Sequence, residues 1–364
     1  MKFKIVRSRF LEGLKDVQNI ISGKGSLPIL QNVLIEAKGK DISLTTTDLD
    51  ISIQSVCECS VEECGATTLP VKLLFNAITK VPEGEVEIDI DAKNKATIST
   101  GNVRYKIAGI DENEFPRISK DENTFSYVIP QATFKEMLKR VFYAASQDDT
   151  RRTLKGVLVS FKESKLTVVA TDGRRLALVT NELEFPKAAE KDIVLPSKTV
   201  TELLRSLVGE EPIQMSIQKT QICFHVGNKI IYSKVMDDTY PNYKQVIPKE
   251  TKEHIKIDRQ LLLDALERVS VMTMDEAHST KLIFDNGKLT VSSSASDIGE
   301  AKDIVPIKYA GEKIEIMFNP TYVMDPLKAI DEDQIMVNIN DGQSPAVITS
   351  GVPFLYVLMP LRIS

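Results

Sequence analysis

The residues of this sequence that most resemble a catalytic set are the carboxylates of Thr47-Asp48-Leu49-Asp50 and Thr171-Asp172. Grouped acidic side chains can hold a metal ion for phosphoryl transfer or nuclease chemistry. Here the Asp-x-Asp pair has no third acidic partner at a fixed spacing and no glycine-rich phosphate loop, and His225, His254 and His278 are scattered. Because Thr-Asp recurs at one place in two parts of the chain, we interpret both copies as strand-end turns in which Asp caps backbone amides. The sequence therefore does not predict an enzyme.

Four cysteines offer a second kind of chemistry, because Cys57, Cys59 and Cys64 lie close together, with Cys223 far away. Neither the C-x-C spacing nor a nearby histidine pair fits a structural zinc site. On a strand, Cys57 and Cys59 would face the same side as small buried hydrophobic residues. We expect free thiols, no metal and no other cofactor.

Composition is that of a soluble globular protein: 364 residues, 42% hydrophobic and 27% charged. This length suggests two or three domains. The first residues, Met-Lys-Phe-Lys-Ile-Val, alternate polar and apolar like a strand and do not resemble a signal peptide. Since no run of about 18 apolar residues occurs, we expect a cytoplasmic protein without a membrane span.

An internal repeat organises the chain. The helix starts at 10–14, 134–138 and 262–266 share one pattern, at offsets of 124 and 128 residues. Three further pairs recur at offsets of 124 to 126: Thr47-Asp48 with Thr171-Asp172, Leu69-Pro70 with Leu195-Pro196, and Phe115-Pro116 with Tyr240-Pro241. Agreement among these offsets predicts three copies of one structural plan.

Each copy contains two helices and a run of strands, which predicts α+β domains with helices on one face of antiparallel sheets. Pro326 should start or kink the last helix. We place domains at 1–122, 123–249 and 250–364, with breaks in the non-periodic segments 111–124 and 247–254. Helices are expected at 8–22, 71–81, 131–145, 197–208, 258–272 and 319–330. Strand segments are expected at 41–53, 85–99, 165–171, 213–225, 288–293 and 334–339.

Charge is unevenly distributed, because the six predicted helices together carry +4 whereas the whole chain carries −5. Such helices could follow DNA phosphates without reading bases, although ordinary solvated helix faces are the alternative. If two chains closed a ring lined by twelve helices of about 10 Å diameter, the opening would be about 28 Å, wider than a duplex of roughly 20 Å. A two-fold ring of this kind would hold DNA loosely.

Four motifs carry a resemblance to a known family. They are Leu27-Pro28-Ile29-Leu30, Thr171-Asp172-Gly173-Arg174-Arg175-Leu176-Ala177, Tyr240-Pro241-Asn242-Tyr243 and Tyr356-Val357-Leu358-Met359-Pro360-Leu361-Arg362. In this order, over the whole chain, they resemble the bacterial β sliding clamp of DNA polymerase III. The resemblance implies three DNA-clamp domains and a head-to-tail homodimer that closes into a six-domain ring. It also implies a non-catalytic processivity factor that encircles duplex DNA independently of sequence.

In that family a clamp loader places the ring on DNA, and partners insert a short apolar peptide between the second and third domains. The implied partners are the DNA polymerase III alpha subunit, the clamp loader delta subunit and other replication and repair proteins. Apolar side chains would form the floor, while Arg175, Asn319 and Tyr322 would fix the peptide's polar ends. Core packing is the alternative for any single member, and Gln245 stands where the family often has a basic residue. The pocket residues implied by the motifs are Leu154, Thr171, Gly173, Arg174, Arg175, Leu176, Pro241, Val246, Asn319, Tyr322, Pro345, Val357, Met359, Pro360, Leu361 and Arg362.

The resemblance also implies two further surfaces. The residues expected to face DNA are Lys24, Lys72, Lys80, Lys135, Lys139, Arg140, Arg151, Arg152, Lys198 and Arg205. The ring interface would join a strand of one chain to an acidic segment of its partner with complementary charge; its expected residues are Arg104, Tyr105, Lys106, Ile107, Ile298, Glu300, Asp303 and Ile304. A protein-interaction scaffold that does not bind DNA is the alternative function, and the basic helices argue against it.

Overall fold

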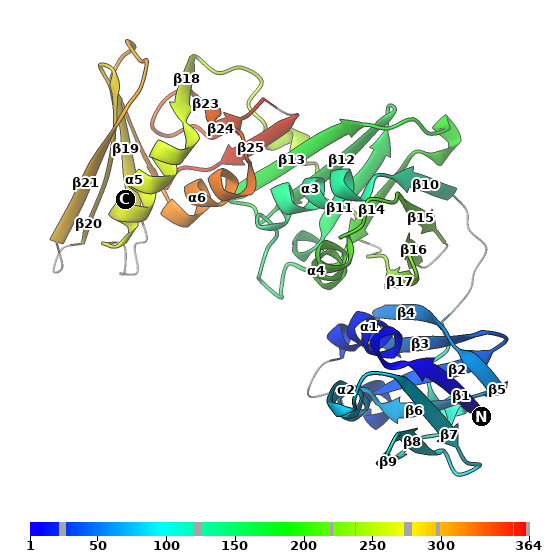
Figure 1. The fold of residues 1–364 in the computed structure, drawn as a ribbon. Coiled ribbons are helices and arrows are strands. Elements are labelled where there is room, and N and C mark those ends of the chain that lie inside the picture. Colours follow the sequence, from blue (N-terminus) through cyan, green and yellow to red (C-terminus); the bar gives the residue numbers. More distant parts are fainter. Residues whose placement is uncertain are drawn as a thin grey trace. The chain divides into compact units, whose positions relative to one another are not determined.

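The computed structural model of the chain describes residues 1–21, 27–118, 125–218, 221–236, 238–272, 279–295, 299–351 and 353–361 (Figure 1). Within these ranges six α-helices occur, and none is long and apolar enough to cross a membrane. The helices are α1 (Arg7–Val17), α2 (Val71–Lys80), α3 (Gln131–Phe142), α4 (Ser197–Ser206), α5 (Arg259–Ser270) and α6 (Pro320–Ala329). Five of the six lie within the predicted segments, whereas α1 begins one residue before its segment and ends at Val17 instead of residue 22.

The strands that the structure describes form four antiparallel sheets. From one edge to the other, the first sheet contains β5 (Ser60–Glu63), β1 (Lys2–Val6), β7 (Glu85–Ile90), β8 (Lys95–Thr100) and β9 (Val103–Ala108). The second contains β10 (Phe125–Ile129), β15 (Ile213–Ile217), β16 (Gln221–Val226), β17 (Lys229–Lys234), β4 (Ile51–Glu58), β3 (Asp41–Thr47), β2 (Asn32–Lys38) and β6 (Gly65–Pro70). The third contains β14 (Lys191–Leu195), β11 (Val157–Lys162), β12 (Lys165–Thr171), β13 (Arg175–Glu182), β25 (Phe354–Leu358), β24 (Ala346–Thr349), β23 (Gln334–Ile339) and β18 (Glu253–Asp258). The fourth contains β21 (Gly299–Pro306), β20 (Lys288–Ala295), β19 (Thr280–Asp285) and β22 (Ile314–Phe318).

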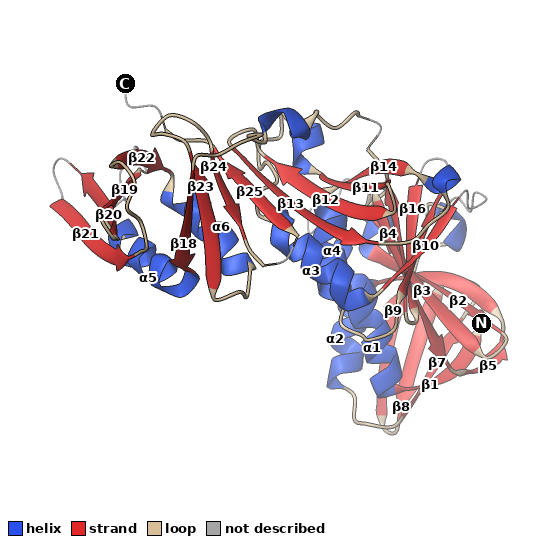
Figure 2. Cartoon of the chain, turned by 90° about the horizontal axis from the view of Figure 1, so that it is seen from above, coloured by secondary structure: helices blue, strands red, loops and turns tan. Residues whose placement is uncertain are grey.

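The chain divides into two compact units. One contains residues 1–135 and 201–235 with the first two sheets, and the other contains residues 136–200 and 236–364 with the last two. In the first unit α1 and α2 pack side by side, and in the second α5 and α6 do so (Figure 2). Each unit thus consists of antiparallel sheets with paired helices, as expected of an α+β fold.

Equivalent helices of the repeat bury equivalent side chains. In α1 the buried residues Phe10, Leu14 and Val17 are spaced by four and three, which places them on one face of a helix. The same spacing recurs in α3 and α5, where it places fully buried residues at Phe134, Leu138, Val141, Leu262, Leu266 and Val269. The repeat inferred from the sequence is therefore also a repeat of the core.

Three of the predicted strand segments are each two strands. Segment 41–53 folds as the hairpin β3–β4, segment 85–99 as β7–β8, and segment 213–225 as β15 and β16. Alternation of polar and apolar residues continues through a tight hairpin, so periodicity alone did not show these turns. By contrast, the segments 165–171 and 334–339 match β12 and β23 residue for residue.

The two eight-stranded sheets join residues from different copies of the repeat. β17 pairs with β4, so that Ile231 lies opposite Ile53, and β25 pairs with β13, so that Tyr356 lies opposite Ala177. These two junctions are equivalent, because Ile53 and Ala177 are 124 residues apart and Ile231 and Tyr356 are 125 apart. The sequence analysis did not anticipate sheets that continue from one copy into the next.

Candidate functional site

The Thr-Asp motifs are capped turns. Asp172 Oδ1 accepts hydrogen bonds from the backbone N–H groups of Arg174 and Arg175, at 2.9 and 3.0 Å, and Asp48 does the same for residues 50 and 51, at 3.1 and 2.9 Å. This confirms the interpretation of both motifs as turns. The residue after Asp has a left-handed backbone in both, with φ of 87° at Gly173 and 79° at Leu49. Only the first of these is a glycine, which adopts that conformation without a steric cost.

An apolar stripe crosses the sheet that contains the β13–β25 junction. It takes one buried side chain from each of six adjacent strands, β14, β11, β12, β13, β25 and β24: Val194, Leu158, Val169, Leu176, Val357 and Val347. Partly buried residues of the segment 236–247, which are Met236, Tyr240, Tyr243 and Ile247, pack against it. The stripe therefore binds the segment that links the second and third copies of the repeat.

The residues of the predicted pocket lie on different parts of this region. Leu176 and Val357 belong to the stripe and are only 1% exposed, whereas Val246 is 40% exposed. Thr171 is buried, and the remaining described members are half-buried or exposed: Leu154, Gly173, Arg174, Arg175, Pro241, Asn319, Tyr322, Pro345, Met359, Pro360 and Leu361. Arg362 lies outside the described residues.

The chain's last described residues are attached by backbone hydrogen bonds at both sides. The Met359 N–H donates to the carbonyl of Arg174, at 3.0 Å, beside the Thr-Asp turn. The Leu361 N–H donates to the carbonyl of Met317 on β22, at 2.8 Å. Residues 359–361 therefore lie between the turn before β13 in one sheet and the edge strand β22 of another, with half-buried side chains.

Arg175 occupies the middle of the site, and its three guanidinium nitrogens are all engaged within the chain. Nε donates to Asp172 at 3.1 Å, Nη2 to the carbonyl of Tyr143 at 2.7 Å, and Nη1 to Asp325 on α6. The guanidinium carbon is 4.1 Å from the ring centre of Tyr322, within cation–π range. Since the side chain is only 9% exposed, Arg175 holds α6 to the Thr-Asp turn, a role different from the predicted binding of the peptide's polar ends.

Two further residues of the predicted pocket, Asn319 and Tyr322, belong to helix α6 and its N-cap. Asn319 caps it, accepting a hydrogen bond from the Thr321 N–H at 3.0 Å, so the helix begins at Pro320. It continues through Pro326, so of the two predicted alternatives, a start or a kink at this proline, the start is wrong. The helix starts at Pro320 because proline is favoured at the first helical position and the Asn319 side chain caps the N-terminus. Pro326, further along, does not end the helix.

The polar partners of Arg175 were not predicted from the sequence. Asp325 lies three residues after Tyr322 on α6, so helical spacing could have shown that the two share a face. Nothing in the local sequence indicated that Tyr143 contributes through its backbone carbonyl. Tyr356 was part of a recognised motif, but its buried hydroxyl was not considered.

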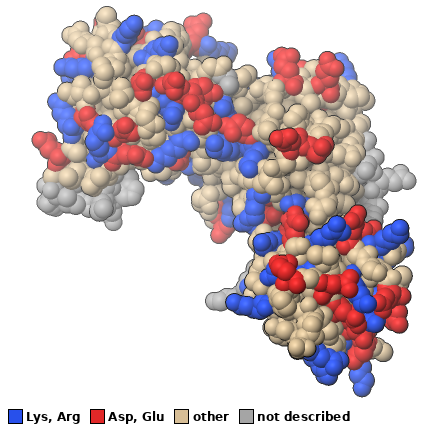
Figure 3. Space-filling model, viewed as in Figure 1, with Lys and Arg blue, Asp and Glu red and all other residues tan. Residues whose placement is uncertain are grey.

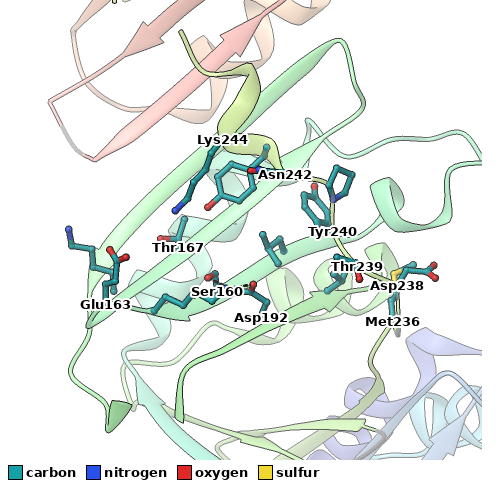
Figure 4. A pocket seen from close by; sticks show the side chains of 16 residues that line it. Ser160, Glu163, Thr167, Asp192, Met236, Asp238, Thr239, Tyr240, Asn242 and Lys244 are labelled. Carbon is teal, nitrogen blue, oxygen red and sulfur yellow. Dashed lines mark hydrogen bonds and ion pairs between the residues drawn. The ribbon is translucent and has the colours of Figure 1, made fainter. Parts of the chain in front are cut away.

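A second pocket of about 550 Å³ lies beside the stripe (Figure 4). Ser160, Thr167 and Asp192 line it from the strands, while Asn242 and Lys244 line it from the segment above. Asp192 accepts from Ser160 at 2.6 Å and pairs with Lys162. Its lining combines lysines with carboxylates, so it presents no single sign of charge. Sequence reasoning did not identify this pocket, which shares only Pro241 with the predicted one.

Basic residues expected to face DNA are mostly at the surface. Lys72, Lys80, Lys139, Arg151, Arg152, Lys198 and Arg205 are exposed, Lys135 is half-buried, and Lys24 lies outside the described residues. Arg205 pairs with Glu202 at 3.1 Å, and Arg151 donates to the carbonyl of Asp172 at 3.1 Å. On the face that Figure 3 presents, Lys and Arg alternate with Asp and Glu, so the basic residues there do not form one continuous patch.

Arg140 corrects one of these expectations. Its side chain is 9% exposed and binds Glu136 at 2.7 Å and Glu332 at 3.3 Å. A guanidinium held by two carboxylates is not free to contact a phosphate. Helical position alone did not show this, because the partner Glu332 is distant in sequence.

The strands expected at the ring interface lie at sheet edges. In the described parts of the chain, β9 pairs only with β8 and β21 only with β20. On β9, Arg104 and Lys106 are exposed and Tyr105 is half-buried, but Ile107 is 4% exposed and belongs to the chain's own core. Ile107 is therefore not available as an interface anchor.

On β21, Glu300 is exposed and Ile304 is 53% exposed, while Ile298 lies outside the described residues. Asp303 accepts a hydrogen bond from Arg268 at 2.6 Å, which lowers its pKa. Asp303 is therefore already paired within its own chain, and Glu300 is the acidic residue left available on this strand.

Metal-ligating residues do not cluster in the described parts of the chain. Within the described ranges no group of three or more His, Cys, Asp or Glu side chains could hold a metal ion. Cys57 is buried on β4, as expected, but Cys59 follows the end of that strand and is half-buried. Burial raises the pKa of both thiols to about 11.

These features define a class of protein: a clamp-type repeat protein in which copies of one α+β unit are joined by continuous antiparallel sheets. Models of the DNA polymerase III beta subunit match the chain three times, the N-terminal domain at residues 1–119, the central domain at 128–242 and the C-terminal domain at 244–362. The chain belongs to this family, the beta sliding clamps of bacterial DNA polymerase III.

Similar proteins cover the chain from end to end. The beta sliding clamp of Chlamydia muridarum is 30% identical over 365 residues, covering 100% of this chain and 99% of the relative, and that of Synechococcus elongatus is 31% identical over 374 residues, covering 100% of both. The crystal structure of the DNA polymerase III subunit beta from Pseudomonas aeruginosa matches with a TM-score of 0.96 at 27% identity, covering 100% of both chains. Membership of this family assigns the chain to DNA replication as a sliding clamp and processivity factor.

Proposed function

We propose that two copies of this chain close head to tail into a ring around duplex DNA and tether DNA polymerase III and other replication proteins to it. The three predicted domains, 1–122, 123–249 and 250–364, would give six domains in the ring. The observation that carries this proposal is the pattern of strand pairing at the junctions between copies of the repeat.

Each copy of the repeat has one strand that can extend the sheet of the preceding copy. β17 and β25 are the strands that fill this role within the chain, and they pair with β4 and β13. The equivalent strand of the first copy is β9, and the equivalent receiving strand of the third copy is β21. Since both are sheet edges among the described strands, one chain's β9 can pair with another chain's β21 and repeat the same junction.

The paired strands also predict the register of that interface. The strand pairing within each copy shows which positions are equivalent. Tyr105 on β9 is equivalent to Ile231 on β17 and Tyr356 on β25, and Ala301 on β21 is equivalent to Ile53 on β4 and Ala177 on β13. Tyr105 should therefore lie opposite Ala301 of the partner, which places Lys106 opposite Glu300. Opposite charges on paired residues stabilise a sheet and guide association.

A disulfide tests this interface. Directly opposite residues of antiparallel strands have Cβ atoms about 4.5–5.5 Å apart, close enough for a disulfide after slight adjustment. The variant Tyr105→Cys/Ala301→Cys should therefore form a cross-linked dimer under mild oxidation, seen on non-reducing gels. The matched control is Tyr105→Cys/Ile304→Cys, which is three residues out of register and should remain uncross-linked. Efficient cross-linking of the control alone would contradict the register.

Encirclement is supported by the surface lysines on the helices. Lys72 and Lys80 on α2, Lys139 on α3 and Lys198 on α4 are exposed and would contact phosphates without reading bases. A clamp loaded onto nicked circular plasmid should stay bound at high salt and leave once the plasmid is linearised. Release from circular DNA at high salt would show simple electrostatic binding, and would contradict a closed ring.

The tethering site is supported by the apolar stripe together with the terminal segment. Met359 is half-buried and lies two residues after Val357, a buried member of the stripe, and its flexible side chain suits varied apolar peptides. We expect the alpha and clamp loader delta subunits to bind at this site. Deletion of residues 359–364 should lower the affinity of a labelled alpha-subunit peptide about thirtyfold, equivalent to about 2 kcal/mol. Fluorescence polarisation would measure this, with sedimentation as the control for an intact dimer.

A further inference from the structure

Helix α6 contains a carbonyl that its own backbone cannot satisfy. In an α-helix the N–H of one residue donates to the carbonyl four residues earlier. Residue 326 is proline, which has no N–H, so the carbonyl of Tyr322 lacks its intrahelical donor. A buried carbonyl without a hydrogen-bond partner is costly.

Tyr356 supplies the missing donor. Its hydroxyl donates to the carbonyl of Tyr322 at 2.7 Å, and its side chain is fully buried. Burial raises the pKa of the Tyr356 hydroxyl, which keeps it protonated and able to donate. Pro326 thus leaves the Tyr322 carbonyl available to accept a hydrogen bond from a side chain of β25.

This hydrogen bond joins two walls of the proposed peptide pocket. Tyr322 lies on α6, with its ring against the guanidinium of Arg175. Tyr356 directly precedes Val357 on β25, and two residues after Val357 comes Met359, whose N–H is bound to Arg174. Fixing the Tyr322 backbone to Tyr356 therefore fixes α6 relative to the strand that leads into the terminal segment.

We infer that Tyr356 and Pro326 are positioning residues of the peptide pocket, which act as a pair: the proline frees the Tyr322 carbonyl and the tyrosine hydroxyl holds it. The inference rests on the proposed peptide site. Neither residue was among those expected to touch the peptide, and the effect of each depends on the identity of the other.

A double-mutant cycle tests the pair. Tyr356→Phe removes the donor but keeps the ring, and should weaken binding of a labelled alpha-subunit peptide about fivefold, the equivalent of about 1 kcal/mol. Pro326→Ala returns a backbone N–H to α6, so Pro326→Ala/Tyr356→Phe should bind within about twofold of Pro326→Ala. A loss that occurs with proline but not with alanine at residue 326 would assign the effect to the hydrogen bond between Tyr356 and the Tyr322 carbonyl and separate it from general loss of packing.

The chain contains a matched control. Tyr143 belongs to the same aromatic group, with its ring centre 6.0 Å from that of Tyr356, and its buried hydroxyl has no hydrogen-bond partner in the described structure. Tyr143→Phe should therefore leave peptide affinity unchanged. Amide hydrogen exchange in α6 provides a second readout, in which Tyr356→Phe should exchange faster and the double variant should recover.

The outcomes are distinguishable. Unchanged affinity and unchanged α6 exchange in Tyr356→Phe would overturn the inference, as would a loss of the same size when Tyr356→Phe is introduced into Pro326→Ala. A wild-type chain that binds no partner peptide would overturn the proposed tethering site instead, and the exchange measurements would still show whether the pair is coupled.

Discussion

Replacing Arg175 by lysine keeps the positive charge but removes the planar, forked donor group. Arg175 donates from three nitrogens in three directions, to Asp172, to Asp325 and to the carbonyl of Tyr143. A lysine ammonium is a single point of charge on a flexible chain and cannot reach all three acceptors. The substitution therefore separates the geometry of the guanidinium from its charge.

The expected loss follows from these contacts. At least one carboxylate contact and the bond to the Tyr143 carbonyl are lost, and hydrogen bonds to charged groups contribute about 1.5–3 kcal/mol each. Loss of the face-on contact with Tyr322, 4.1 Å from the guanidinium carbon, adds up to about 1 kcal/mol. Since Asp325 is 25% exposed, water compensates in part. We expect Arg175→Lys to destabilise the α6 region by about 3 kcal/mol.

Amide hydrogen exchange of α6 and β25 is the suitable assay, because the chain has two compact units and global unfolding would mix them. The matched control is Arg151→Lys, at an arginine that donates to the Asp172 carbonyl of the same turn. Its side chain is 54% exposed, and the expected change is below about 0.5 kcal/mol. Equal exchange rates in the two variants would refute the assignment of Arg175 as the residue that holds α6 in place.

Three further outcomes are expected. Gly173→Ala should lower stability by about 1 kcal/mol because of its left-handed backbone, whereas Leu49→Gly at the equivalent turn should raise it by up to about 0.5 kcal/mol; thermal unfolding would measure both. In native protein at about pH 7.5, iodoacetamide should modify exposed Cys64 first and spare buried Cys57 and Cys223, whose pKa values are raised by burial to about 11 and about 12; mass spectrometry after digestion would show the order. Arg140→Ala should lower the free energy of unfolding by about 2 kcal/mol, because it removes the ion pairs with Glu136 and Glu332. It should not reduce retention of the clamp on plasmid, which loss of a phosphate contact would do; exposed Lys139→Ala is the comparison.

Much of the fold could be predicted from the sequence because the repeat imposes the same local pattern three times. The positions of Phe10, Phe134 and Leu262 were enough to place three helices, and Thr-Asp was enough to identify two capped turns. Both kinds of signal are local, since a helix face and an Asp-capped turn each depend on residues within a few positions of one another.

The remainder depended on contacts between residues far apart in sequence. Arg140 has the sequence environment of a solvated helix residue, and only its contact with Glu332 shows that it is buried. Ile107 alternates correctly for either a core or an interface strand, and the sheet decides between them. In the same way, Pro326 was expected to disturb its helix, but Tyr356, far along the chain on β25, supplies the missing hydrogen bond.

The junction strands also bear on how a ring of this kind would open. Junctions within a chain and junctions between chains would have the same strand pairing but resist separation differently. The β17–β4 and β25–β13 junctions are formed inside a continuous chain, so their strands remain covalently connected after they separate. A β9–β21 contact between chains has no such tether. A loader that pulls on the ring would therefore open it at the β9–β21 contact. The number of repeat copies in one chain would set how many such contacts between chains a ring contains.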